Sequence, residues 1–137
     1  MNNMENTINR KYSINDIIGN GKFGVVYMVT NIRTKETLAM KTEDKKSLFK
    51  LLKREANILN HLSNNGVRQI PLIHWYGLYN DLTCLIMTYF CYDLNEYINT
   101  KKPSVEKIYI ILKNALIFLK VFIQMILFIE ILNLKIL

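Results

Sequence analysis

The spacing of apolar and polar residues predicts β-strands in the first part of the chain. Runs of β-branched and aromatic residues lie on both sides of a glycine-rich stretch, and the second run ends near Asn31. After a turn at residues 33–35, a third strand is expected over residues 36–42. Because side chains alternate along a strand, Leu38 and Met40 are expected to share one face of it.

The period of the pattern then changes to that of a helix. Apolar residues recur at helical spacing over residues 47–62, and Asn64-Asn65-Gly66 is a typical helix end. Two more strands and two more helices follow, at residues 72–78, 83–89, 93–99 and from the expected N-cap Ser104 onward. Three strands, a helix, two strands and then helices predict an α+β fold.

The glycine-rich stretch is the first candidate for chemistry. Gly19, Gly21 and Gly24 have the spacing of a loop through which backbone can approach a phosphate. A strand over residues 25–30 follows them, whereas a dinucleotide-binding fingerprint needs a helix there. No Gly-Lys-Ser/Thr ends the stretch, so a Walker loop is excluded as well. A glycine loop between two strands is either a plain hairpin turn or a loop that covers nucleotide phosphates, and the glycines alone do not decide between the two.

A lysine and a carboxylate extend this candidate site. Alternation in the third strand places Ala39 and Lys41 together, facing the space under the glycine loop, where an ammonium suits phosphate oxygens. Glu55 is the one acid of the helix over residues 47–62, and therefore the candidate partner of Lys41. The alternatives are an ordinary exposed lysine in a strand and a surface ion pair of Glu55 with Lys50 or Arg54.

In this order and spacing, the motifs resemble the N-terminal lobe of a eukaryotic protein kinase over residues 12 to about 120. Within that family the casein kinase I branch is the most similar. The motifs that carry the resemblance are Ile18-Gly19-Asn20-Gly21-Lys22-Phe23-Gly24-Val25-Val26-Tyr27, Ala39-Met40-Lys41, Glu55, Gly66-Val67-Arg68-Gln69-Ile70-Pro71 and Trp75-Tyr76-Gly77.

The resemblance implies a serine/threonine kinase fold with ATP as the cofactor. The implied lobe has a five-stranded antiparallel sheet and one regulatory helix, followed by one or two helices of a truncated C-terminal lobe. Backbone amides of residues 19–24 would cover the phosphates, Lys41 would contact them, and Glu55 would position Lys41.

The adenine side of the site is also implied by the resemblance. Ile18, Val26 and Ala39 would enclose the adenine ring, and Met87 falls at the gatekeeper position before a hinge at residues 88–90. The expected ATP-binding residues are Ile18, Gly19, Asn20, Gly21, Lys22, Phe23, Gly24, Val25, Val26, Ala39, Lys41, Met87, Thr88 and Phe90.

The later part of the sequence lacks the groups that transfer phosphate. Neither H-R-D-x-x-x-x-N nor D-F-G occurs, and Glu130 is the only acid after Glu106, so no catalytic base and no Mg²⁺ ligands are expected. The expected organisation is a polar extension at residues 1–11, the lobe at 12–90, the hinge and first C-lobe helices at 91–120, and an apolar tail at 121–137. A truncated kinase homologue without activity on its own is therefore predicted.

The apolar tail has an explanation in the gene. Residues 128–137 can be written in codons that spell H-R-D-I-K-P-E-N when they are read from the third base of the first codon. Residues 121–127 can be recoded in the same frame as I-H-S-N-D-F-I. A frameshift near residues 120–121 is therefore expected to have replaced a kinase catalytic loop.

Composition narrows the partners. The net charge is +7, but the lysines are scattered and no nucleic-acid motif accompanies them, so a nucleic-acid partner is not expected. Two cysteines and a polar N-terminus without an apolar signal segment favour a reduced, cytoplasmic protein without a metal site. Lysine, glutamate, glutamine and asparagine interrupt the apolar tail, which argues against a membrane span.

Three alternatives remain beside the truncated kinase. The first is a non-catalytic pseudokinase lobe that binds nucleotide or, through exposed apolar surface, another protein. The second is a small protein that associates with a membrane through its apolar tail. The third is a gene remnant without function.

Overall fold

The computed structural model describes residues 7–21 and 24–134, and for residues 121 and 125–134 it describes the backbone only. The chain divides into two compact units, Met1–Cys91 and Tyr92–Leu137. Each unit is described by itself.

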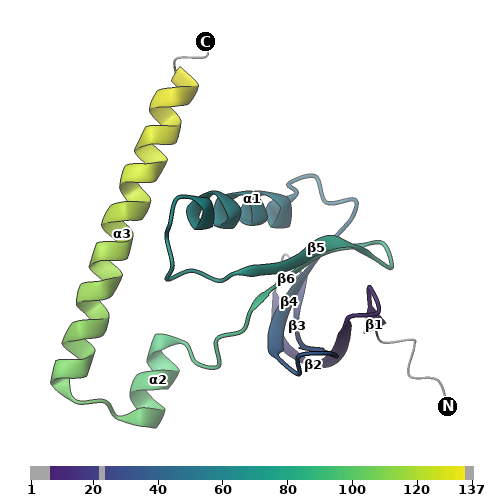
Figure 1. Cartoon of the computed structure of the whole chain (residues 1–137), viewed down its shortest axis with the longest axis horizontal. Helices are drawn as coiled ribbons and strands as arrows, with labels where there is room; N and C mark the ends of the chain where they lie inside the picture. The colour runs from purple at the N-terminus through teal and green to yellow at the C-terminus, as the bar shows by residue number, and fades with distance from the viewer. Residues whose placement is uncertain (1–6, 22–23, 135–137) are drawn as a thin grey trace. The chain divides into compact units, whose positions relative to one another are not determined.

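The first unit is an antiparallel sheet with one helix (Figure 1). The strands lie in the order β1-β2-β3-β4-β6-β5, and α1 connects β4 to β5. The bounds are β1 (Thr7–Ile8), β2 (Tyr12–Gly21), β3 (Gly24–Asn31), β4 (Thr37–Asp44), α1 (Leu51–Asn64), β5 (Ile73–Tyr79) and β6 (Leu82–Thr88). The predicted α+β fold is confirmed.

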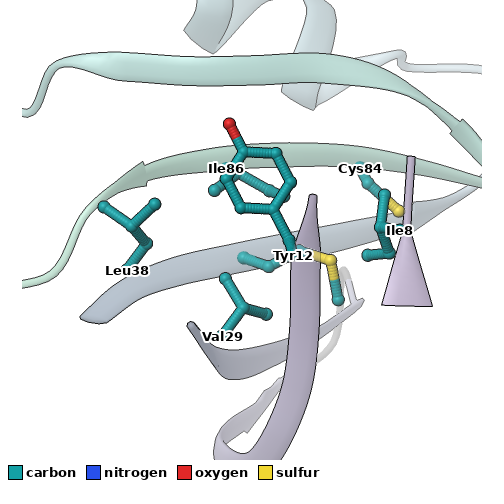
Figure 2. Close-up of a cluster of buried hydrophobic side chains, with 7 residues drawn as sticks. Ile8, Tyr12, Val29, Leu38, Cys84 and Ile86 are labelled. Atoms are coloured by element: carbon teal, nitrogen blue, oxygen red, sulfur yellow. The ribbon is translucent and has the colours of Figure 1, made fainter. Parts of the chain in front are cut away.

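One face of the sheet carries a cluster of side chains that are 0–1% exposed, here called the closed cluster. Figure 2 shows the ring of Tyr12 near its centre, with Leu38 on one side and Ile8 and Cys84 on the other. The Tyr12 hydroxyl donates a hydrogen bond to the carbonyl oxygen of His74 at 3.2 Å. The members of the closed cluster are Ile8, Tyr12, Val29, Leu38, Met40, Cys84 and Ile86.

The strand β1 is the sixth strand of the sheet and was not among the five expected. Thr7 and Ile8 pair with Ser13 and Tyr12 of β2, so the chain folds back on itself at residues 9–11. Ile8 is 1% exposed, although it belongs to the stretch expected to be a polar extension. A two-residue strand is too short to produce the alternation from which strands are predicted.

The other face of the sheet packs against α1 and is here called the α1 face. Leu52 and Ala56 of α1 pack with Leu85 and Met87 of β6, and Ala39 of β4 packs against them. The register pairs Ala39 with Met87 and Lys41 with Leu85. Because Leu38 and Met40 belong to the closed cluster, the predicted alternation along β4 is confirmed.

The helix α1 begins at Leu51, four residues later than the periodicity predicted. Leu48 and Phe49 had been expected inside the helix, but they are 93% and 65% exposed and lie before it. Lys50 has a left-handed backbone conformation with φ 45°, which interrupts the helix there. The predicted helix end is nearly correct, since Asn65 donates its backbone N–H to the carbonyl oxygens of the last turn.

The second unit contains α2 (Leu94–Lys101) and α3 (Val105–Leu134). Asp93 caps α2 by accepting the Glu96 N–H at 2.7 Å. Ser104 accepts the Lys107 N–H at 3.4 Å, which agrees with its expected position as an N-cap. Where side chains are described, no helix has the length and apolar content needed to cross a membrane.

Candidate functional site

The glycine loop connects β2 to β3, as the sequence predicted. The ladder between the two strands is regular next to the loop, where Gly19 pairs with Val26 and Gly21 with Gly24. It is irregular between Ile14 and Gly19, which bends β2. Lys22 and Phe23, expected to bind ATP, lie outside the described residues.

Gly24 is the glycine that the packing requires. Its φ is +146°, and a Cβ added there would lie 1.8 Å from the carbonyl oxygen of Thr42. The Thr42 hydroxyl holds this contact by donating to the Val25 carbonyl at 2.8 Å and accepting the Val25 N–H at 3.2 Å. A Cβ on Gly21 would meet nothing within 4 Å. Gly24 therefore anchors the loop to β4, while the backbone at Gly21 is open.

Lys41 and Glu55 form the ion pair that the sequence predicted, with 2.6 Å between Nζ and Oε1. The central strand β4 presents Lys41 on the α1 face, and Glu55 lies in the second turn of α1. Their side chains are 39% and 35% exposed, so the pair contributes at most about 1 kcal/mol to stability. Its main effect is to fix the position of the ammonium group. Glu55 therefore pairs with Lys41 and not with Lys50 or Arg54, the alternative partners.

A pocket of about 450 Å³ opens between the glycine loop, β4 and α1. This volume lies within the range of small-molecule sites. Lys41 and Glu55 are on its wall, so an ammonium and open glycine backbone face the same space. The lining residues are Gly19, Asn20, Gly21, Gly24, Val25, Val26, Lys41, Thr42, Glu43, Leu51, Leu52 and Glu55.

Of the residues expected on the adenine side, Val26 lines this pocket, whereas Ile18, Ala39, Met87, Thr88 and Phe90 are not part of its described lining. Ile18 and Phe90 are 42% and 61% exposed. Met87 is buried and packs with Leu52 and Ala56 of α1, and Ala39 packs against the same cluster. Met87 is therefore a core residue, which is compatible with the expected gatekeeper position. Thr88 donates its backbone N–H to the Leu72 carbonyl at 3.0 Å, so this amide of the expected hinge is engaged within the sheet.

Glu43 is a residue of the pocket that the sequence reasoning missed. It is 5% exposed, and its carboxylate accepts hydrogen bonds from the Ser47 hydroxyl, the Leu51 N–H and the Leu52 N–H at 2.8, 3.0 and 3.1 Å. Burial alone raises the pKa of this carboxyl, but the three hydrogen bonds outweigh burial and lower the pKa of Glu43 below its ordinary value of 4.5. The sequence does contain a signal for Glu43. It lies two residues after Lys41, so strand alternation places both side chains on the same face of β4.

The cysteines and the titratable groups of the described residues offer no metal site. Burial raises the pKa of the Cys84 thiol to about 11, while Cys91 is exposed. Among the residues that the structure describes, no three His, Cys, Asp or Glu side chains are grouped closely enough to hold a metal ion.

Comparison with known families agrees with this geometry. Residues 12–122 match the protein kinase domain, which covers most of the 137-residue chain. Protein kinase domains contain a lysine–glutamate ion pair between a strand and a helix beneath a glycine-rich loop. The match ends at residue 122, although the backbone of α3 is helical as far as Leu134. The chain belongs to the protein kinase family.

Proposed function

We propose that this chain binds ATP in the pocket between the glycine loop, β4 and α1. The observation that carries the proposal is the Lys41–Glu55 pair, 2.6 Å apart on the wall of a pocket of about 450 Å³. The carboxylate of Glu55 engages one position of the ammonium, which has two further N–H donors for phosphate oxygens. Backbone N–H groups of an open glycine loop are the complementary phosphate ligands.

The adenine ring would extend from this pocket toward Ile18, in the second half of β2, and the end of β6. Ile18, Val26 and Ala39 would contact the ring, and Met87 would border it. Main-chain groups of residues 88–90 would bind the adenine edge. Since the Thr88 N–H is bonded to Leu72, the main-chain groups of the following residues are the better candidates.

Calorimetric titration of the full chain with Mg-ATP tests this proposal. Lys41→Met removes a charged hydrogen-bond donor and should lower the affinity by about tenfold or more. Lys45→Met is the matched control, because Lys45 also forms an ion pair, 3.2 Å from Asp81, but does not line the pocket. Equal affinities of the two variants would remove Lys41 from the site, and no heat at millimolar ATP would overturn the proposal.

Within the protein kinase family, we propose that the chain is a casein kinase I-like serine/threonine kinase homologue that lacks activity on its own. The 137 residues contain neither H-R-D nor D-F-G. Phosphate transfer depends on positioning the hydroxyl nucleophile and on Mg²⁺, and these motifs supply both functions. We therefore expect no transfer of phosphate to casein or to the chain itself. Robust incorporation of labelled phosphate by the purified chain would contradict this assignment.

A frameshift near residues 120–121 explains the missing motifs. The family match ends at residue 122, next to the proposed change of frame. Sequencing the gene and its downstream flank tests the explanation, because the shifted frame should encode H-R-D-I-K-P-E-N and continue into D-F-G. Stop codons or unrelated residues in that frame would show that residues 121–137 are a genuine tail.

A further inference from the structure

The helix α1 has no N-cap of its own. The residue at the cap position, Lys50, has a left-handed backbone and makes no capping hydrogen bond through its side chain. The first turn of α1 contains no acidic residue. The first backbone N–H groups of a helix lack partners within the helix, so a buried helix start needs acceptors from elsewhere.

Glu43 of β4 provides these acceptors. Its Oε1 accepts the Leu51 N–H at 3.0 Å and its Oε2 accepts the Leu52 N–H at 3.1 Å. The negative charge also lies at the positive end of the helix dipole. The Ser47 hydroxyl donates to the same carboxylate at 2.8 Å, which connects the segment before the helix to it. The start of α1 is thus fixed to the strand that carries Lys41.

Two polar contacts join β4 to α1, Glu43 with Leu51 and Lys41 with Glu55, and they are about equally far apart on the strand and on the helix. Lys41 and Glu43 are two residues apart on one face of β4, or about 6.6 Å. Leu51 and Glu55 are four residues apart in α1, or about 6 Å along the helix axis. Because Glu43 holds the helix start and Lys41 holds Glu55, β4 contacts α1 through polar groups at two points one turn apart.

The apolar contacts of α1 and its polar contacts act on different parts of the helix. Leu52 and Ala56 belong to the buried cluster on the α1 face, the partly buried Leu59 packs against it, and Leu62 is 2% exposed. These side chains lie at helical spacing and turn one stripe of α1 inward. The first turn, which precedes Glu55, is fixed in addition by its hydrogen bonds to Glu43.

We propose that Glu43 is a positioning residue for the Lys41–Glu55 pair. Its ionised carboxylate sets the position of the first turn of α1, which holds Glu55 within reach of Lys41 and keeps the ammonium at the pocket. This role rests on the proposed binding of ATP. A carboxylate that acted only as a helix cap would stabilise the fold without affecting the ammonium of Lys41.

The first test does not use nucleotide. In the full chain with ¹⁵N-labelled lysine, the Nζ signal of Lys41 is assigned by its disappearance in Lys41→Met. Glu43→Gln should shift this signal toward that of Glu55→Gln, in which the pair is absent. Asp44→Asn is the control, because Asp44 is exposed on the same strand and accepts the Lys46 N–H at 2.7 Å. Its Lys41 signal should match that of the unmodified chain.

The second test is a double-mutant cycle on ATP affinity. Glu43→Gln should weaken binding by about fivefold in the unmodified chain and have no further effect in Glu55→Gln, because the residue acts through Glu55. If Glu43→Gln fails to fold, Ser47→Ala removes one hydrogen bond from the carboxylate and should produce a smaller shift of the Lys41 signal in the same direction.

The outcomes separate this inference from the proposed function. An unchanged Lys41 signal in a folded Glu43→Gln chain of lower thermal stability would show that Glu43 is only a cap, and the inference would be wrong. If no variant binds ATP but the Lys41 signal shifts as expected, the positioning role is supported and the proposed function fails.

Discussion

The two faces of the sheet differ in what their side chains do. The closed cluster consists of seven side chains that are at most 1% exposed, and all of them are apolar except for the Tyr12 hydroxyl. The α1 face buries fewer apolar side chains and carries the charged groups Lys41 and Glu43. One strand serves both faces, since β4 alternates between the closed cluster and the pocket. In β4, Leu38 and Met40 on one face therefore serve folding, whereas Lys41 on the opposite face is available to a ligand in the pocket.

The largest effect is expected from the closed cluster. Leu38→Ala removes a fully buried side chain and should lower the free energy of unfolding by about 2–5 kcal/mol, measured by urea denaturation. Lys41→Met, three positions along the same strand but on the other face, should change it by less than about 1 kcal/mol. Comparable losses in the two variants would break the distinction between the faces.

A smaller loss is expected at the glycine loop. Gly24→Ala places a Cβ against the Thr42 carbonyl in a backbone region reserved for glycine, so the free energy of unfolding should fall by about 1–3 kcal/mol. ATP affinity should fall with it, because the loop must move away from β4. Gly21→Ala is the matched substitution, since it meets no neighbouring atom and should leave the urea midpoint nearly unchanged. A stable Gly24→Ala chain would show that the contact with Thr42 is dispensable.

Acid should weaken the α1 face selectively. The pKa of Glu43 is below its ordinary value of 4.5 in the folded chain, so the unfolded chain takes up the proton first as the pH falls. Its stabilisation is complete above that ordinary value and is lost as the pH falls through the lowered folded pKa. The stability difference between the unmodified chain and Glu43→Gln should therefore shrink between pH 6 and pH 3 in urea titrations. A difference independent of pH would contradict the role of the ionised carboxylate.

The smallest effect concerns the two thiols. Cys84 lies in the closed cluster, and its raised pKa of about 11 leaves almost no thiolate at pH 8, whereas Cys91 is exposed. An aromatic disulfide reagent should label one thiol per folded chain rapidly, and both thiols in denaturant. Rapid labelling of two thiols in the folded chain would indicate that the closed cluster opens readily.

The sequence was sufficient to predict the part of the site that depends on local spacing. Alternation placed Lys41 under the glycine loop, and Glu55 was identified because its helix contains no other acid. Both signals come from residues whose geometry follows from their own element, and the 2.6 Å ion pair agrees with them. The adenine contacts came from family resemblance alone, and they remain predictions.

Other features depended on contacts between distant segments. Leu48 extends the helical periodicity, but a periodicity does not reveal where the first N–H groups of a helix find acceptors. Those of α1 find them on Glu43, eight residues before Leu51, so the helix begins later than its apolar pattern predicts. Ile8 was likewise overlooked, because an isolated apolar residue in a polar stretch carries no period.

The burial of Ile8 has a practical consequence for recombinant work. The family match begins at residue 12, and an expression fragment cut at that boundary would omit β1. Removing Ile8 would expose apolar side chains of the closed cluster beside Tyr12 to solvent. The exposed apolar surface should promote aggregation and proteolysis of the fragment. Affinity tags joined directly to Tyr12 would carry the same defect, so a linker belongs upstream of Thr7.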